Sequence, residues 1–156
     1  MRVFAWALLI LMSGDVLPPL LLAGDPGGRA QYIGGTVAAL PSKSEGHIKM
    51  TDEEALLFRT KQASVRIPYS KINTLEYGQR VNRRVLEAVL ISPLLLLAKK
   101  RKHFLTIGYV DERGNQQALV FQVDKGAVRQ LLVGLEAKTG RKVEFQDEDA
   151  RKAGKG

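Results

Sequence analysis

The sequence contains no cysteine and only two histidines among its 156 residues. Without cysteine the chain has no disulfide framework, no thiolate nucleophile and no cysteine-based zinc site. The two histidines, His47 and His103, have no second ligand three or four residues away, which is the spacing that places two metal ligands on one face of a helix. The sequence therefore predicts neither a metal site nor a cofactor, and places His47 in a hairpin and His103 at the start of a strand.

Motifs of catalysis and of nucleic-acid recognition are lacking as well. The serines are not set in a G-x-S-x-G turn, and the acidic pairs at 52–54 and 111–112 fall at expected turns, where carboxylates are common. Aromatic residues make up 6% of the chain, and the basic run KKRKHF has a single aromatic neighbour, whereas single-strand binding favours basic residues interleaved with aromatics. We therefore expect no catalytic residues, no enzyme activity and no nucleic-acid partner.

Long apolar runs are few, and the first lies at the N-terminus. Arg2 precedes ten apolar residues, Val3 to Met12, and small residues follow. This order is typical of a secretory signal peptide, here residues 1–24. The alternative is a retained anchor, which would place Asp15 inside the bilayer at a cost of about 2.5–3.5 kcal/mol. We expect an exported protein of the periplasm or cell envelope, with a Gly- and Pro-rich linker at 25–31.

The charge balance is strongly basic. Lys and Arg number 24 against 16 Asp and Glu, which gives a formal net charge of +8. Such an excess favours association with anionic partners, lipid surfaces among them, and does not bear on the fold.

Short apolar segments separated by turn residues dominate the rest of the chain and predict strands. The expected strands are 32–40, with a bulge at Gly34-Gly35, and 47–50, 55–60, 64–68, 72–77, 103–110 and 117–123. A helix follows at 124–140, because Val128, Leu131, Leu132 and Leu135 recur at helical spacing between Asp124 as cap and Gly140 as stop. Residues 146–156 show no periodicity and predict a disordered tail. The fold class is mainly β (α+β), with the helix covering a sheet.

Two resemblances refine this picture. The segment IPYSKINTLEYG (67–78), through Ile67, Tyr69, Ser70 and Ile72, resembles the strand–turn–strand segment of bacterial PH-like and GRAM-like domains. The resemblance implies a curved antiparallel sheet of about seven strands with one C-terminal amphipathic helix, over residues 32–145. The segments HFLTIGYVDERGNQQALVFQVDK and LLVGLEAKTGRKV also resemble small exported bacterial proteins of unassigned function, which implies no activity.

The insert at 78–102 departs from that pattern, since a compact PH-like domain has a short turn there. Its apolar run, Val85 to Ala98, has fourteen residues and would span about 21 Å as a helix, against about 30 Å for a bilayer core. Basic residues stand on both sides of it. The expected contact residues are Arg80, Arg83, Arg84, Leu94, Leu95, Leu96, Leu97, Lys99, Lys100, Arg101 and Lys102.

An apolar helical segment with basic ends suits an interfacial membrane element, because leucines enter the acyl boundary while Lys and Arg meet phosphates. Two other roles stay open: a cover for an open sheet face, and a contact for a protein partner. We expect a non-catalytic exported binding or scaffold domain that attaches peripherally to an anionic membrane surface. The alternative is a protein–protein interaction module of the cell envelope, and an enzyme of unknown type ranks third.

Overall fold

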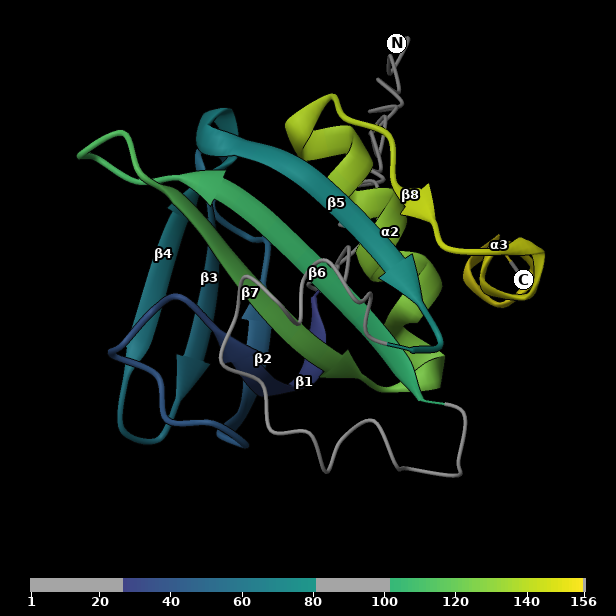
Figure 1. Ribbon diagram of the computed structural model, residues 1–156, viewed down its shortest axis with the longest axis horizontal. Coiled ribbons are helices and arrows are strands. Elements are labelled where there is room, and N and C mark those ends of the chain that lie inside the picture. Colours follow the sequence, from purple (N-terminus) through teal and green to yellow (C-terminus); the bar gives the residue numbers. More distant parts are fainter. Residues whose placement is uncertain (1–26, 81–101, 156) are drawn as a thin grey trace, which may run out of the picture.

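The computed structural model describes residues 27–80 and 102–155. These residues form a mainly β fold, with one open sheet and two helices beside it (Figure 1). The strands are β1 (Gly28–Gly35), β2 (Glu45–Lys49), β3 (Ala55–Thr60), β4 (Ser64–Pro68), β5 (Ile72–Gly78), β6 (His103–Val110), β7 (Gln116–Val123) and β8 (Glu144–Phe145). The helices are α2 (Lys125–Thr139) and α3 (Glu148–Lys155), and a 3-10 turn, Tyr69–Lys71, precedes β5. The predicted mainly β class, with a helix after the seventh strand, is confirmed.

The sheet consists of two antiparallel meanders joined at one seam. Strands β1 to β4 form the first and β5 to β7 the second, and β1 pairs with β7, so the order is β4-β3-β2-β1-β7-β6-β5-β8. The last strand, β8, pairs in parallel with β5. The expected sheet of seven antiparallel strands is therefore corrected to a mixed sheet of eight.

The first strand begins earlier than the sequence predicts. The expected linker at 25–31 is wrong from Gly28 onward, because β1 starts there and pairs with β2. The strand ends at Gly35, where a Cβ would lie 2.3 Å from the Ala118 carbonyl oxygen, and residues 36–44 form a loop instead of extending the strand to residue 40. The predicted irregularity is present, since the pairing with β7 shifts register between Tyr32 and Gly34.

Helix α2 covers the core with the predicted stripe. Val128, Leu131, Leu132 and Leu135 are its buried residues. The helix ends at Gly140, whose φ of 68° is the left-handed conformation that glycine accepts most easily. Asp124 occupies the N-cap position but makes no side-chain capping hydrogen bond, so the predicted cap is wrong in that detail.

The C-terminal segment is not a disordered tail over the described residues. Residues 148–155 form α3, and Ala150 on this helix is 0% exposed. Asp147 accepts a hydrogen bond from the Ala150 amide at 2.7 Å, as an N-cap residue does. Figure 1 shows α3 beside β8, at the opposite end of the sheet from β4. The prediction failed because the segment has little apolar surface, and one small buried alanine gives no visible period.

The insert lies mostly outside the described residues, but both of its ends are defined. Strand β5 ends at Gly78, one residue later than predicted, and β6 begins at His103, as predicted. Strand β6 is buried on both of its faces, because the successive residues Phe104 and Leu105 are 6% and 0% exposed. Within residues 27–80 and 102–155, no helix is long and apolar enough to cross a membrane.

Candidate anion-binding groove

A row of basic and titratable side chains crosses the first three strands on the face away from the core. Arg29 of β1 is paired with His47 of β2, and His47 is paired with Arg59 of β3. Their strand neighbours Ile48 and Phe58 belong to the buried core, and successive side chains of a strand point to opposite faces. All three residues of the row are exposed, which places them together on the outer face of the sheet.

The row lies in a groove of about 480 Å³, which we call the basic groove. This volume falls within the range of about 300–1,000 Å³ that is usual for ligand pockets. The lining residues are Arg29, Glu45, Gly46, His47, Lys49, Arg59, Thr60 and Lys61. Four cations therefore share a ligand-sized concavity with a single carboxylate.

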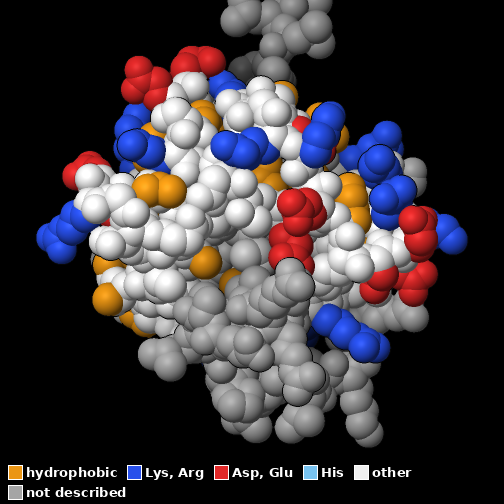
Figure 2. Space-filling view, turned by 45° about the horizontal axis from the view of Figure 1, so that its top comes forward, with side chains coloured by type: hydrophobic (Ala, Val, Ile, Leu, Met, Phe, Trp, Pro, Cys, Tyr) orange, Lys and Arg blue, Asp and Glu red, His pale blue; other side chains and the backbone are white. Residues whose placement is uncertain are grey.

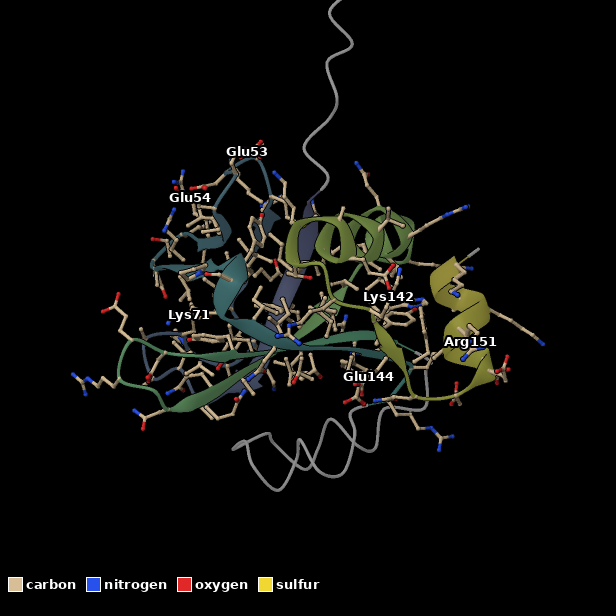
Figure 3. The ribbon with its side chains drawn as sticks, turned by 90° about the horizontal axis from the view of Figure 1, so that it is seen from above. Glu53, Glu54, Lys71, Lys142, Glu144 and Arg151 are labelled. Atoms are coloured by element: carbon tan, nitrogen blue, oxygen red, sulfur yellow. The ribbon has the colours of Figure 1, made fainter. Side chains whose placement is uncertain are left out.

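Acidic residues of the neighbouring turn are engaged elsewhere. Asp52 and Glu54 both pair with Arg66, at 3.2 and 3.5 Å, and Glu53 pairs with Lys138 of α2 at 3.0 Å. Figure 3 shows Glu53 and Glu54 together on this turn, on the far side of the molecule from Arg151 of α3. The backbone N–H of Glu54 and the Arg66 guanidinium hold the pKa of Asp52 below its usual range. These three carboxylates are thus committed to cations outside the basic groove.

Within residues 27–80 and 102–155, the groove cations have no such acidic partners. Among the described residues, no carboxylate forms an ion pair with Arg29, Lys49, Arg59 or Lys61. The four cations make the groove positively charged, which attracts anions. Arginine guanidinium groups bind planar or tetrahedral oxyanions through paired hydrogen bonds.

Two of the contact residues predicted from sequence belong to the described residues, one on each side of the insert. Arg80 is exposed just after β5, and Lys102 is half-buried just before β6. The others lie outside the described residues: Arg83, Arg84, Leu94, Leu95, Leu96, Leu97, Lys99, Lys100 and Arg101.

A partly buried tyrosine–histidine pair joins the end of β5 to the start of β6. The Tyr77 hydroxyl lies 2.5 Å from Nδ1 of His103, and the two rings stack 6.1 Å apart. Burial lowers the pKa of His103, and the positive charge of Lys125 lowers it further. Burial also raises the pKa of Tyr77 to about 12. The lowered pKa favours the neutral histidine, whose Nδ1 can accept the hydrogen bond from the tyrosine hydroxyl, so this pair is a structural contact.

Sequence reasoning missed the basic groove. A usable signal was present, since Glu45, His47 and Lys49 alternate with the buried residues of β2, and Arg59 and Lys61 continue the alternation at the end of β3. The strand register, which places Arg29 in the same row, was not readable from alternation alone.

Over the same described residues, no three His, Asp or Glu side chains come together in a way that could hold a metal ion. No family model matches the chain, and no curated protein matches it.

Proposed function

We propose that the protein is a non-catalytic binding domain that attaches peripherally to an anionic membrane surface. Two basic elements make the attachment: the basic groove, and the insert from Arg80 to Lys102 with its leucines. The observation that carries the proposal is the set of four groove cations with which no carboxylate of the described chain forms an ion pair. Each basic residue near an anionic surface contributes about 1 kcal/mol of attraction.

The sheet register supports joint use of the two elements. One row of paired residues runs from His103 through Val123, Ala30 and Gly46 to Thr60. The insert returns to the sheet at His103, and Gly46 and Thr60 line the groove. Adjacent strands lie about 4.8 Å apart, so the return point and the groove are separated by about 14–19 Å along the row. The proposal takes one lipid surface to meet both elements, and two weak attachments on one molecule reinforce each other.

The wider setting belongs to the same proposal. The two meanders joined at β1 and β7, followed directly by α2, support a PH-like arrangement. The apolar run after Arg2 supports export to the periplasm or cell envelope, with residues 1–24 as a signal peptide. Export would bring the groove to a lipid surface and away from nucleic acid.

Vesicle co-sedimentation tests the proposal with three sets of charge variants. The groove set changes Arg29, Lys49, Arg59 and Lys61 to Gln, and the insert set changes Lys99, Lys100, Arg101 and Lys102 to Gln. Basic side chains occur elsewhere on the surface (Figure 2), so a control set removes the same charge at Lys71, Arg113, Lys125 and Lys152, which are exposed and outside both elements.

We expect the parent protein to bind anionic vesicles, to ignore neutral ones and to dissociate as salt rises. The groove and insert sets should each weaken binding at least tenfold, and the control set less than threefold. Equal losses in all three sets would reduce the effect to net charge and contradict the assignment of these two elements.

A protein-interaction role in the cell envelope is the second candidate, and one observation favours it. Val133 of α2 is 59% exposed beside a cavity of about 250 Å³ between α2, β8 and α3. Binding through this cavity would need no lipid. A Val133→Asp variant with unchanged vesicle binding but a lost protein partner would favour this alternative.

A further inference from the structure

We infer that the cavity between α2, β8 and α3 binds the C-terminal end of a partner protein whose last residue is apolar. The cavity has a volume of about 250 Å³, and we call it the helix cavity. It shares no lining residue with the basic groove, so the inference goes beyond membrane attachment and does not depend on it. It names the chemistry that a protein partner needs at this place.

The floor of the helix cavity is apolar. Leu132 and Val143 line it and are 3% and 7% exposed, and the half-buried ring of Phe145 lies beside them. A Cβ at Gly154 would lie 2.6 Å from the Phe145 ring and 3.1 Å from Leu132, so α3 approaches both elements closely and closes a third side. Val133, a further lining residue, is 59% exposed. The helix cavity therefore offers apolar surface to a partner.

Two cations also line the helix cavity, one from each helix. Arg129 lies four residues before Val133 and therefore on the same face of α2. Nζ of Lys155 lies over the Phe145 ring, 5.7 Å from its centroid, which is within the range of a cation–π contact. Both cations are exposed, and no carboxylate in residues 27–80 or 102–155 forms an ion pair with either.

The acidic side chain of the lining already has partners of its own. Oε1 of Glu136 accepts a hydrogen bond from the backbone N–H of Val143 at 2.8 Å. Its Oε2 lies 3.8 Å from Nζ of Lys142, which is not a lining residue. Arg129 and Lys155 are thus left for an anion from outside, and a guanidinium can hold both oxygens of a carboxylate at once.

Size and spacing point to a chain end. The helix cavity is smaller than the range of about 300–1,000 Å³ that is usual for small-molecule pockets, so it suits one side chain. The cation of Lys155 lies directly over an apolar ring, so the ligand must carry its negative charge next to its apolar group. A C-terminal residue meets this requirement, because its side chain and its α-carboxylate leave the same carbon. It also enters a small site with only one chain connection, and capture of a terminal carboxylate is a known mode of peptide recognition.

The experiment titrates short Gly/Ser peptides into isotope-labelled protein and follows the backbone amide signals by NMR, which detects weak binding. One peptide ends in leucine with a free carboxylate, a second is the same peptide with an amidated end, and a third ends in glycine with a free carboxylate. N-acetylleucine is the small-molecule probe. The key variant is Arg129→Gln with Lys155→Gln. The matched control is Lys125→Gln with Lys152→Gln, which removes one exposed cation from each of the same two helices outside the helix cavity. Thermal melts establish that each variant is folded.

We expect the leucine peptide to bind the parent protein and to shift the amide signals of residues that line the helix cavity. The amidated peptide and the glycine peptide should each bind at least fivefold more weakly, since one lacks the charge and the other the apolar group. The Arg129/Lys155 variant should bind the leucine peptide at least tenfold more weakly, and the control variant should stay within twofold of the parent.

Four outcomes would overturn the inference. Equal binding of the amidated and free peptides removes the carboxylate site, and binding retained by the Arg129/Lys155 variant moves it away from the helix cavity. N-acetylleucine that binds as tightly as the leucine peptide makes the ligand a small apolar acid instead of a chain end. Binding of none of the probes removes the site altogether. Vesicle binding of the parent protein is measured separately, so each of these failures leaves the proposed membrane attachment standing, and its failure leaves this site standing.

Discussion

The hydroxyl of Tyr77 lies 2.5 Å from Nδ1 of His103, where β5 ends and β6 begins. The two rings are inclined by only 10°, and the edge of Phe145 packs on Tyr77 from β8. The hydrogen bond joins the two sides of the insert within the sheet. A neutral histidine can accept at Nδ1 from the hydroxyl, whereas a protonated histidine can only donate there, so the direction of this hydrogen bond depends on the protonation state of His103.

That dependence predicts a pH effect on stability. The pKa of His103 is lowered in the folded protein by burial and by Lys125, so the folded state binds a proton less readily than the unfolded chain, whose histidine titrates near 6.5. The lowered pKa of His103 therefore contributes to the free energy of unfolding. This contribution is fully present above about pH 6.5 and is lost as the pH falls from there through the lower folded pKa. Urea midpoints at pH 8 and pH 5 should therefore differ, with the lower value at pH 5.

The control for this effect is His103→Asn, which keeps a hydrogen-bond acceptor and does not titrate. Its midpoint should change less between the two pH values than that of the parent protein. Asp52 and Asp111 also have lowered pKa values, but their ordinary value is 3.8, so they stay ionised throughout this window. An identical pH dependence in the parent protein and the variant would contradict the assignment to His103.

The stripe of α2 predicts a large difference between two neighbouring positions. Leu131 is 1% exposed in the core, whereas Arg129 is exposed on the same helix. Leu131→Ala should lower the free energy of unfolding by about 2–5 kcal/mol, the range for a buried leucine. Arg129→Ala should change it by about 0.5 kcal/mol or less. Equal denaturant midpoints for the two variants would show that α2 does not seal the core.

The packing of α3 makes Gly154 a second sensitive position. A Cβ at Gly154 would lie 2.6 Å from the Phe145 ring and 3.1 Å from Leu132. Gly154→Val should therefore displace α3 and destabilise the fold by about 1–3 kcal/mol, the usual cost of overpacking. Gly126 on α2 is the matched control, since nothing lies within 4 Å of its Cβ position and alanine favours a helix. A Gly126→Ala variant that melts no lower than the parent, beside a Gly154→Val variant that melts several degrees lower, is the expected pair.

Alternation and turn residues predicted most strands because most strands have one face in the core. Leu56 and Phe58 on β3 are such core residues, and the turn at Gly114 has a φ of 83°, which the Gly-Asn pair there favours. The start of β1 was missed because Gly28 and Arg29 resemble a linker by composition. Their place in the sheet comes from pairing with Ile48 and His47, which no local pattern reveals.

The site was harder to predict than the fold, for a related reason. The basic clusters of the insert are contiguous in sequence and drew the prediction there. The basic groove is assembled from three strands, and Arg29 and Arg59 are brought together only by register. The pairing of strands that are distant in sequence cannot be read from local patterns in a single sequence.

Leu95 and Leu96 of the insert, which lie outside the described residues, give the last prediction. If these leucines enter the acyl boundary, replacing both by Ser removes apolar contact with lipid and leaves the charges unchanged. Binding to anionic vesicles should then fall at every salt concentration, because the lost contribution is not electrostatic. The melting temperature without vesicles should stay within about 2 °C of the parent value, since side chains in water add little to folding.

The same double variant separates the membrane role from a role as cover for the sheet. Strand β6 is buried on both faces. In the alternative role, Leu95 and Leu96 would cover the face of the sheet that carries Phe104. In that case the serine hydroxyls would replace buried apolar area and be left without partners, which is strongly destabilising. The matched control is Lys99→Gln with Lys100→Gln, which should weaken vesicle binding mainly at low salt and leave the melt unchanged. A sharp drop in melting temperature for the leucine variant, with vesicle binding equal to that of the parent, would assign the leucines to the sheet and leave the basic groove as the membrane contact.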